Sequence, residues 1–148
     1  EFLNMKGRSA LVYGENVLEP LPIRTEDVRL QIERELHSKI LLLREGYLES
    51  AGSARHLRNL IQKSFSACIA IFNAMLYLKK GEAPRDKRDT IREMNRVFTI
   101  DANVFMLCME VRQGTDRLSS KEVKDLFKQY MREVEKLFHI IDVLEPTN

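Results

Sequence analysis

Apolar residues recur at every third or fourth position along most of the chain, which is the spacing of one face of an α-helix. The most apolar stretch is Ser64–Lys80, SFSACIAIFNAMLYLKK, the second half of a helix predicted over residues 54–80. At about 100° per residue, the apolar positions of this helix cover more than half of its circumference. Such a helix is packed on at least two sides, so we expect it at the centre of the fold.

The remaining helices are predicted to be amphipathic, with one apolar stripe each: about Glu26–Tyr47, Asp86–Phe98, Ala102–Gln113 and Ser120–Leu144. Residues suited to N-caps precede most of these segments, and Glu122 completes a capping box: Thr25, Ser53, Asp101 and Ser119. Three helices are long and two are short. This pattern predicts an all-α, antiparallel up-down four-helix bundle, in which two short helices form a broken fourth leg.

The first 24 residues have a different pattern and are predicted to be extended. Residues 9–13 are suited to a short strand, and Pro20 and Pro22 exclude a helix after it. A single strand leaves its backbone groups unpaired, so it needs a sheet from a second copy or from a region outside this chain. We therefore interpret the chain as a piece of a longer protein, with an extended segment at 1–24 and a helical bundle at 25–145.

Composition narrows the class of protein further. The 24 basic and 22 acidic residues give a net charge of +2, which indicates no strong attraction to nucleic acid or to an acidic membrane. No uninterrupted apolar run reaches the roughly 18 residues of a membrane span, and no signal-peptide pattern is visible. Cys68 and Cys108 lie in apolar helical segments and are expected to be buried free thiols. We expect a cytoplasmic protein.

Several polar residues around the central helix are candidates for substrate binding. Ser64 lies in the apolar arc, where it either donates to the carbonyl four residues earlier or touches a ligand in a pocket. The other candidates lie on the polar strip of this helix or at its ends: Arg58, Lys63, Asn73, Lys80 and Arg85. The basic residues among them are suited to a phosphate group, although a solvated surface explains them as well.

No catalytic or metal signature accompanies these residues. His37, His56 and His139 do not form a metal-binding spacing with one another or with a cysteine. We therefore predict neither a metal site nor a cofactor. Arg132 and His139 lie two turns apart on one face of the last helix. With six residues between them, this pair resembles the HEPN motif, an Arg followed after four to six residues by a His. The motif implies metal-independent RNA cleavage at a dimer interface; a solvated helix face is the alternative.

A broader resemblance covers nearly the whole chain. The runs EFLNMKGRSALVYGENVLEPLPI, RLQIERELHSKILLLREGYL and LRNLIQKSFSACIAIFNAMLYLKKGEAP resemble the C-terminal half of bacterial nucleotidyltransferases of the DNA polymerase beta type. In that family a small catalytic domain precedes a substrate-binding or HEPN-like bundle, so SALVY would be its last strand. The family's catalytic Gly-Ser pair and following Asp-x-Asp are absent here, because Gly52-Ser53 has no such carboxylates after it.

The resemblance implies an accessory domain that helps bind or position the acceptor substrate and has no catalytic residue of its own. Its partner would be a nucleotidyltransferase domain, in the same protein or in another. Two alternatives remain open. One is a HEPN-type ribonuclease that uses Arg132 and His139, and the other is an interaction module that forms a homodimer through the exposed sides of the helices at 54–80 or 120–144.

Overall fold

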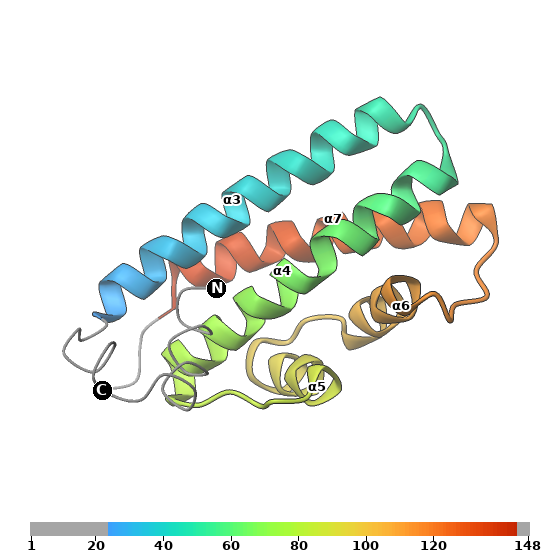
Figure 1. Ribbon diagram of the computed structural model, residues 1–148. Coiled ribbons are helices and arrows are strands. Elements are labelled where there is room, and N and C mark those ends of the chain that lie inside the picture. Colours follow the sequence, from blue (N-terminus) through green and yellow to red (C-terminus); the bar gives the residue numbers. More distant parts are fainter. Residues whose placement is uncertain (1–23, 145–148) are drawn as a thin grey trace, which may run out of the picture.

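The computed structural model describes residues 24–144, which form five α-helices and no strand (Figure 1). The helices are α3 (Thr25–Ser50), α4 (Ala54–Lys80), α5 (Lys87–Phe98), α6 (Ala102–Gln113) and α7 (Ser120–Asp142). The predicted all-α fold is confirmed. The predicted extended segment, apart from Arg24, lies outside the described residues.

The three long helices, α3, α4 and α7, pack against one another, and α4 also contacts α5 and α6 (Figure 1). Helix α4 therefore packs on all four of the other described helices. Its largest buried side chains have no exposed surface: Leu57, Ile61, Phe65, Phe72, Met75 and Leu76. The central position predicted for this helix from its wide apolar arc is confirmed.

The fourth leg of the bundle consists of α5 and α6, which pack on α4 and on each other. Figure 1 shows both short helices close to end-on, so they run across the direction of the long helices. Phe105 of α6 reaches into the core, where its ring meets the edges of Phe72 and Tyr130 at centroid separations of 4.8 and 6.1 Å. Edge-to-face aromatic pairs of this kind add to the free energy gained from burial alone.

Local signals in the sequence set most helix ends. The side chains of Ser53, Asp86 and Asp101 accept hydrogen bonds from backbone N–H groups of the first turns of α4, α5 and α6. Ser119 and Glu122 form the predicted capping box of α7. At the other end of α4, Gly81 adopts the left-handed conformation, with φ of 82°. The predicted bounds of α4 and α6 are confirmed without change.

Helix α3 departs from its prediction at both ends. Thr25 is the first helical residue and not the cap, and Arg24 precedes it without a side-chain cap. The helix continues past Gly46, which was expected in its last turn, and ends at Ser50. A β-carbon on Gly46 would lie 2.7 Å from Leu60 Cδ2 and closer still to Cδ1. Gly46 is therefore a packing residue inside the helix, where α3 and α4 approach closely.

The apolar character of α4 is explained by its position in the core. Among the described helices, α4 alone is long enough and apolar enough to cross a membrane. Most of its apolar stretch is, however, buried inside the bundle. The central helix of a soluble bundle can have the same length and hydropathy, because it must bury more than one face. The fold therefore accounts for α4 without a membrane.

Candidate substrate-binding face

One side of α4 carries a row of polar residues that face α5, α6 and the loop after α6. At 100° per residue, Arg58, Gln62, Asn73 and Lys80 fall within about 60° of one another around the helix. We call these four residues the polar edge of α4. Three of them are predicted substrate-binding residues, and each of the four has a partner in the fourth leg or in the loop that follows it.

The N-terminal half of the polar edge holds α6 and the loop that follows it. Arg58 Nη1 lies 2.5 Å from Asp116 Oδ1, and Arg58 Nη2 donates to the Leu118 carbonyl at 3.4 Å. The Asp116 side chain is only 3% exposed, and its hydrogen bond with Arg58 lowers the pKa of this carboxyl. Gln62 Nε2 donates to the Val111 carbonyl at 3.1 Å, which satisfies a backbone group at the end of α6.

The C-terminal half of the polar edge holds α5. Asn73 Oδ1 accepts a hydrogen bond from the buried Thr90 hydroxyl at 3.0 Å. Lys80 Nζ lies 2.8 Å from Glu93 Oε2, and Arg96 also donates to Glu93. These hydrogen bonds, first from Arg96 and then from Lys80, lower the pKa of Glu93 from 4.5 to about 2. The predicted binding residues Arg58, Asn73 and Lys80 thus fasten the fourth leg to α4.

Ser64 lies in the core and not on this edge. Its hydroxyl lies 2.8 Å from the Leu60 carbonyl, as predicted for a serine inside a helix, and 2.7 Å from the Tyr130 hydroxyl. Ser64 is 2% exposed and Tyr130 is 1% exposed. Both hydroxyl groups are therefore already hydrogen-bonded, which gives Ser64 a structural role.

The thiols of Cys68 and Cys108 lie near the Tyr130 hydroxyl of this pair. Tyr130 also hydrogen-bonds to Cys68, and burial raises the pKa of Tyr130 well above its ordinary value. Burial likewise raises the pKa of Cys68 to about 12 and that of Cys108 well above 9.0. Both cysteines are free and buried, as predicted. Thiols in this state are poor nucleophiles and poor metal ligands, because both roles require the thiolate.

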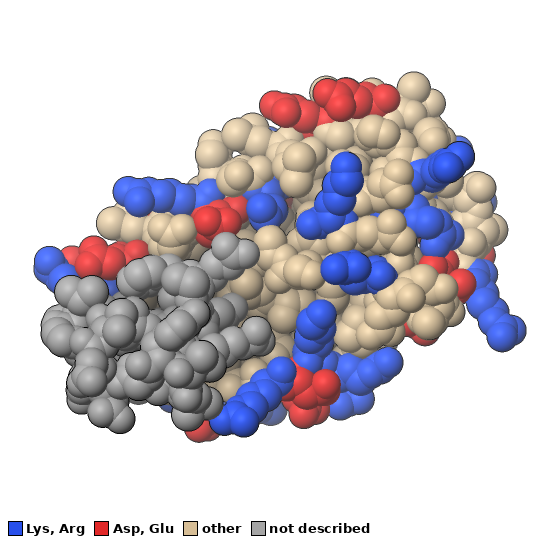
Figure 2. All heavy atoms as spheres, viewed as in Figure 1, with Lys and Arg blue, Asp and Glu red and all other residues tan. Residues whose placement is uncertain are grey.

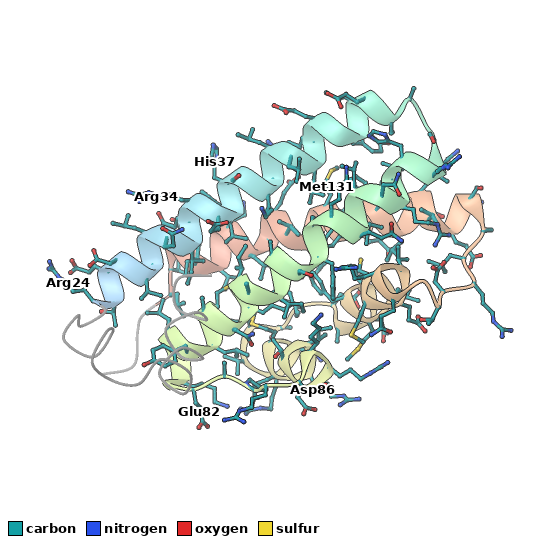
Figure 3. The ribbon with its side chains drawn as sticks, viewed as in Figure 1. Arg24, Arg34, His37, Glu82, Asp86 and Met131 are labelled. Atoms are coloured by element: carbon teal, nitrogen blue, oxygen red, sulfur yellow. The ribbon has the colours of Figure 1, made fainter. Side chains whose placement is uncertain are left out.

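Two of the predicted binding residues remain available to a ligand. Lys63 and Arg85 are exposed, and neither has a hydrogen bond or ion pair with another residue of 24–144. On the face shown in Figure 2, Lys and Arg side chains are spread over the middle, and acidic groups interrupt them toward the margins. Figure 3 shows Glu82 and Asp86, which flank Arg85, on the outside of the molecule. Arg85 therefore lies among charges of both signs.

The helix face with Arg132 and His139 is exposed, as predicted, and neither side chain has an ion pair within residues 24–144. Their neighbour Glu135 pairs with Arg44 of α3 at 3.4 Å. His56 is different, because its Nε2 atom is buried without a hydrogen-bond partner in the described part of the chain. No cluster of three or more His, Cys, Asp or Glu suited to a metal ion occurs between residues 24 and 144.

Sequence reasoning did not identify Thr90, Asp116 and Tyr130 as the partners of Asn73, Arg58 and Ser64. The partners are 17, 58 and 66 positions away along the chain, on other elements. The sequence does contain one signal of these contacts, because Arg58, Gln62, Asn73 and Lys80 share one face of a predicted helix. Such a row indicates an edge that meets a neighbour as readily as it indicates a ligand site.

Comparison with known proteins adds no further assignment. No family model, no curated protein and no solved structure matches this chain. The class that the fold defines is an all-α helical bundle. A function must therefore be argued from the surface residues and from the resemblance described above.

Proposed function

We propose that this bundle is the accessory domain of a nucleotidyltransferase and that it positions the acceptor substrate with the exposed cations of the α4–α5 connection. The resemblance to the C-terminal half of the polymerase-beta-type enzymes suggests the class. In that class, the reaction centre lies in a separate catalytic domain, which agrees with the lack of Asp-x-Asp in this chain. The bundle would bind and orient, and the catalytic domain would carry the metal-dependent chemistry.

The observation that carries this proposal is the position of the unpaired cations. Helix α3 begins, and α4 ends, at the same end of the bundle (Figure 1). Exposed Arg85, Lys87 and Arg88 lie in the connection that starts there and in the first turn of α5, and Figure 3 shows the neighbouring Asp86 beneath α5. A catalytic domain joined ahead of Arg24 would lie at the end of the bundle where this connection starts. Positive charge beside a nucleotide site suits an acceptor or a nucleotide that carries phosphate groups.

The first test is the coding sequence upstream of Glu1, where a Gly-Ser pair followed by Asp-x-Asp is expected. The protein translated from that longer sequence is then assayed for transfer of label from each of four α-labelled nucleoside triphosphates to a cell extract. The double variant Arg85→Glu with Arg88→Glu should require roughly tenfold more extract for the same labelling rate. A matched control, Lys121→Glu with Lys124→Glu, reverses two charges on α7, at the opposite end of the bundle, and should label at the normal rate.

Two results would contradict the proposal. One is the absence of the two-carboxylate signature upstream of Glu1. The other is an equal acceptor requirement for the Arg85/Arg88 variant and the wild type. Circular dichroism of each variant shows whether the bundle remains folded.

A second candidate function is RNA cleavage by Arg132 and His139. The observation in its favour is that both side chains are exposed on one face of α7, about 10 Å apart along the helix axis. Cleavage of a labelled single-stranded RNA by this chain should stop when both residues are changed to Ala. Lys128→Ala, on the same face, serves as the control. If the unchanged chain does not cleave RNA at concentrations that permit dimers, this candidate is excluded.

A further inference from the structure

Helix α3 has a second apolar stripe, on the side that faces solvent. Leu30, Leu41 and Leu48 are 49%, 43% and 79% exposed. Their spacing of eleven and seven residues places them within about 20° of one another around the helix. The core stripe of α3, which includes the fully buried Leu36 and Leu43, lies on the opposite side. A surface helix of a monomer needs only one apolar stripe, so the second stripe requires an explanation.

Between Leu30 and Leu48, one flank of this stripe carries two charges of opposite sign. Arg34, near the start, and Glu45, near the end, lie on one flank of the three leucines at about 40° and 60° from Leu30. Neither Arg34 nor Glu45 has an ion pair within residues 24–144. Figure 3 shows Arg34 pointing away from α4 and α7, whereas the ring of exposed His37 has its centroid 6.3 Å from that of Phe138 of α7. Within the described part of the chain, the three leucines are exposed and these two charges are unpaired, so they can meet another molecule.

This pattern is complementary to itself when two copies of α3 run in opposite directions. If the twofold axis passes beside residue 39, Leu30 of one copy lies opposite Leu48 of the other, and His37 opposite Leu41. On the flank, Arg34 then faces Glu45 of the second copy. Each of these contacts occurs twice, because a twofold interface uses the same patch on both subunits. We propose that the outer face of α3 is a homodimer interface, with α3 packed antiparallel on α3 of a second copy.

Other occupants fit this face less well. In a parallel pair the two copies of this flank would lie on opposite sides of the contact, so Arg34 of one copy would not meet Glu45 of the other. An anionic membrane surface attracts helices whose polar flanks are rich in Lys and Arg. The flanks of this stripe also carry Glu33, Glu45 and Glu49, which such a surface would repel. The proposal uses no residue of the α4–α5 connection, so it stands or falls separately from the proposed function.

The first measurement is the molar mass by light scattering and sedimentation equilibrium over a range of concentrations. We expect twice the chain mass of 17.3 kDa, that is, about 35 kDa. Leu41→Asp places a charge in the centre of the stripe and should shift the protein to a monomer. Tyr77→Asp is the matched control, because Tyr77 of α4 is 47% exposed and lies outside the stripe. A monomer at all concentrations, or a dimer that Leu41→Asp leaves intact, would overturn the proposal.

Charge reversal tests the antiparallel direction. Arg34→Glu alone and Glu45→Arg alone each create two like-charge pairs and should weaken the dimer roughly tenfold at low salt. The double variant restores opposite charges at both positions and should return the dimer constant to near the wild-type value. If the double variant is as weak as the single ones, Arg34 does not face Glu45 and the proposed arrangement is wrong.

Cysteine cross-linking tests the register. Leu30 and Leu48 of one chain lie about 27 Å apart along α3, so cysteines at these positions cannot join within one chain. Leu30→Cys combined with Leu48→Cys should form a covalent dimer on mild oxidation, visible by gel electrophoresis without reductant. Each single variant should remain uncross-linked. Cross-linking of the single variants would show a parallel pair and would overturn the proposal.

Discussion

Ser64 and Tyr130 place two hydroxyl groups in the apolar centre of the bundle, 2.7 Å apart. Ser64 has a second acceptor in its own helix, the Leu60 carbonyl, whereas Tyr130 depends on groups of α4. A buried polar group that loses its partner costs the protein its full desolvation free energy. The pair therefore fixes α7 against α4 in one register and disfavours alternatives in which these hydroxyl groups would be unpaired.

Replacement of these hydroxyls should show unequal costs. Tyr130→Phe removes one hydrogen bond and leaves Ser64 its carbonyl partner, so we expect a loss of about 1 kcal/mol in the free energy of unfolding. Ser64→Ala leaves the phenol without its oxygen partner and should cost more, about 1–3 kcal/mol. The double variant should cost less than the sum of the two. Urea unfolding of all three variants measures this coupling, and strictly additive values would contradict it.

Glu93 makes a pH-dependent contribution to stability. Its hydrogen bonds with Arg96 and Lys80 hold its pKa at about 2, below the ordinary 4.5. A carboxyl whose pKa is depressed in the folded state stabilises that state above its unfolded pKa, and this stabilisation is lost as the pH falls toward the folded pKa. Its contribution is therefore complete above about pH 4.5 and disappears between that value and about pH 2.

The variant Glu93→Gln removes this titration. Wild type should be the more stable of the two near neutral pH, and the difference should shrink steadily between pH 4.5 and pH 2. Thermal unfolding followed by circular dichroism at a series of pH values gives the comparison. Glu110→Gln is the control, because it removes one carboxylate from α6, the other short helix. A stability difference that stays constant down to pH 2 would show that Glu93 titrates normally.

At the residue scale, the sequence could predict only what depends on near neighbours along the chain. The Ser64 bond to the Leu60 carbonyl is local, and it was predicted. The bond to Tyr130 joins residues 66 positions apart and depends on how α7 is rotated against α4. The same limit applies to Arg58 and Asn73, whose partners in the fold were not predicted. Their partners, Asp116 and Thr90, are brought to them only by the packing of the fourth leg.

At the scale of whole helices, Gly46 determines how closely α3 and α4 pack. The residue lies inside α3, and a β-carbon there would collide with the Leu60 side chain, which is 8% exposed. Gly46→Ala raises helix propensity by about 1 kcal/mol but overpacks the contact, which typically costs about 1–3 kcal/mol. We expect net destabilisation, measured as a lower urea midpoint.

A second substitution separates the two effects of this change. In a Leu60→Ala background the colliding side chain is removed, so Gly46→Ala should no longer destabilise the protein and should show its gain in helix propensity. If Gly46→Ala has the same cost in the wild-type and Leu60→Ala backgrounds, the collision is not its cause. Residue 60 is apolar in both backgrounds, so the two costs of Gly46→Ala differ only through the size of the side chain it meets.

Gly46 also shows where helix prediction failed and why. A glycine near the end of an apolar pattern normally marks a helix end, and this rule placed the end of α3 too early. The same rule succeeded at Gly81 and Gly114, which adopt the left-handed conformation at the ends of α4 and α6. The sequence does not distinguish a glycine needed for its backbone from one needed for close packing. That distinction depends on Leu60 of the neighbouring helix.

At the scale of the whole molecule, the number and packing of the helices followed from the sequence, but the direction of the fourth leg did not. Apolar stripes predict which faces are buried, and they leave the crossing angle of a short helix open. The polar edge of α4 supplies specific partners for α5, α6 and the loop after them, so it selects among those angles. Function was less predictable still, because no catalytic signature lies in the chain and the surface cations lack a specific spacing.

The two thiols report on opening of the whole bundle. Cys68 of α4 and Cys108 of α6 are buried, and burial raises the pKa of Cys68 to about 12. At pH 8 a disulfide reagent such as DTNB should therefore react with neither thiol on the scale of seconds, and with both at once in 6 M guanidinium. The slow native rate should rise with urea in parallel with unfolding. Rapid labelling without denaturant would show that the core opens locally.

The contact of Arg29 with the far end of α7 determines how the bundle responds to force. Arg29 of α3 donates to the backbone carbonyls of Asp142 and Leu144, and the bond to Leu144 measures 3.0 Å. The described chain therefore enters and leaves the bundle at one corner, and α3 and α7 lie antiparallel from that corner onward (Figure 1). A pull on these two ends would peel α3 from α7 turn by turn and would not shear the whole contact at once. The bundle should thus be mechanically soft along this axis, whatever its resistance to heat or denaturant.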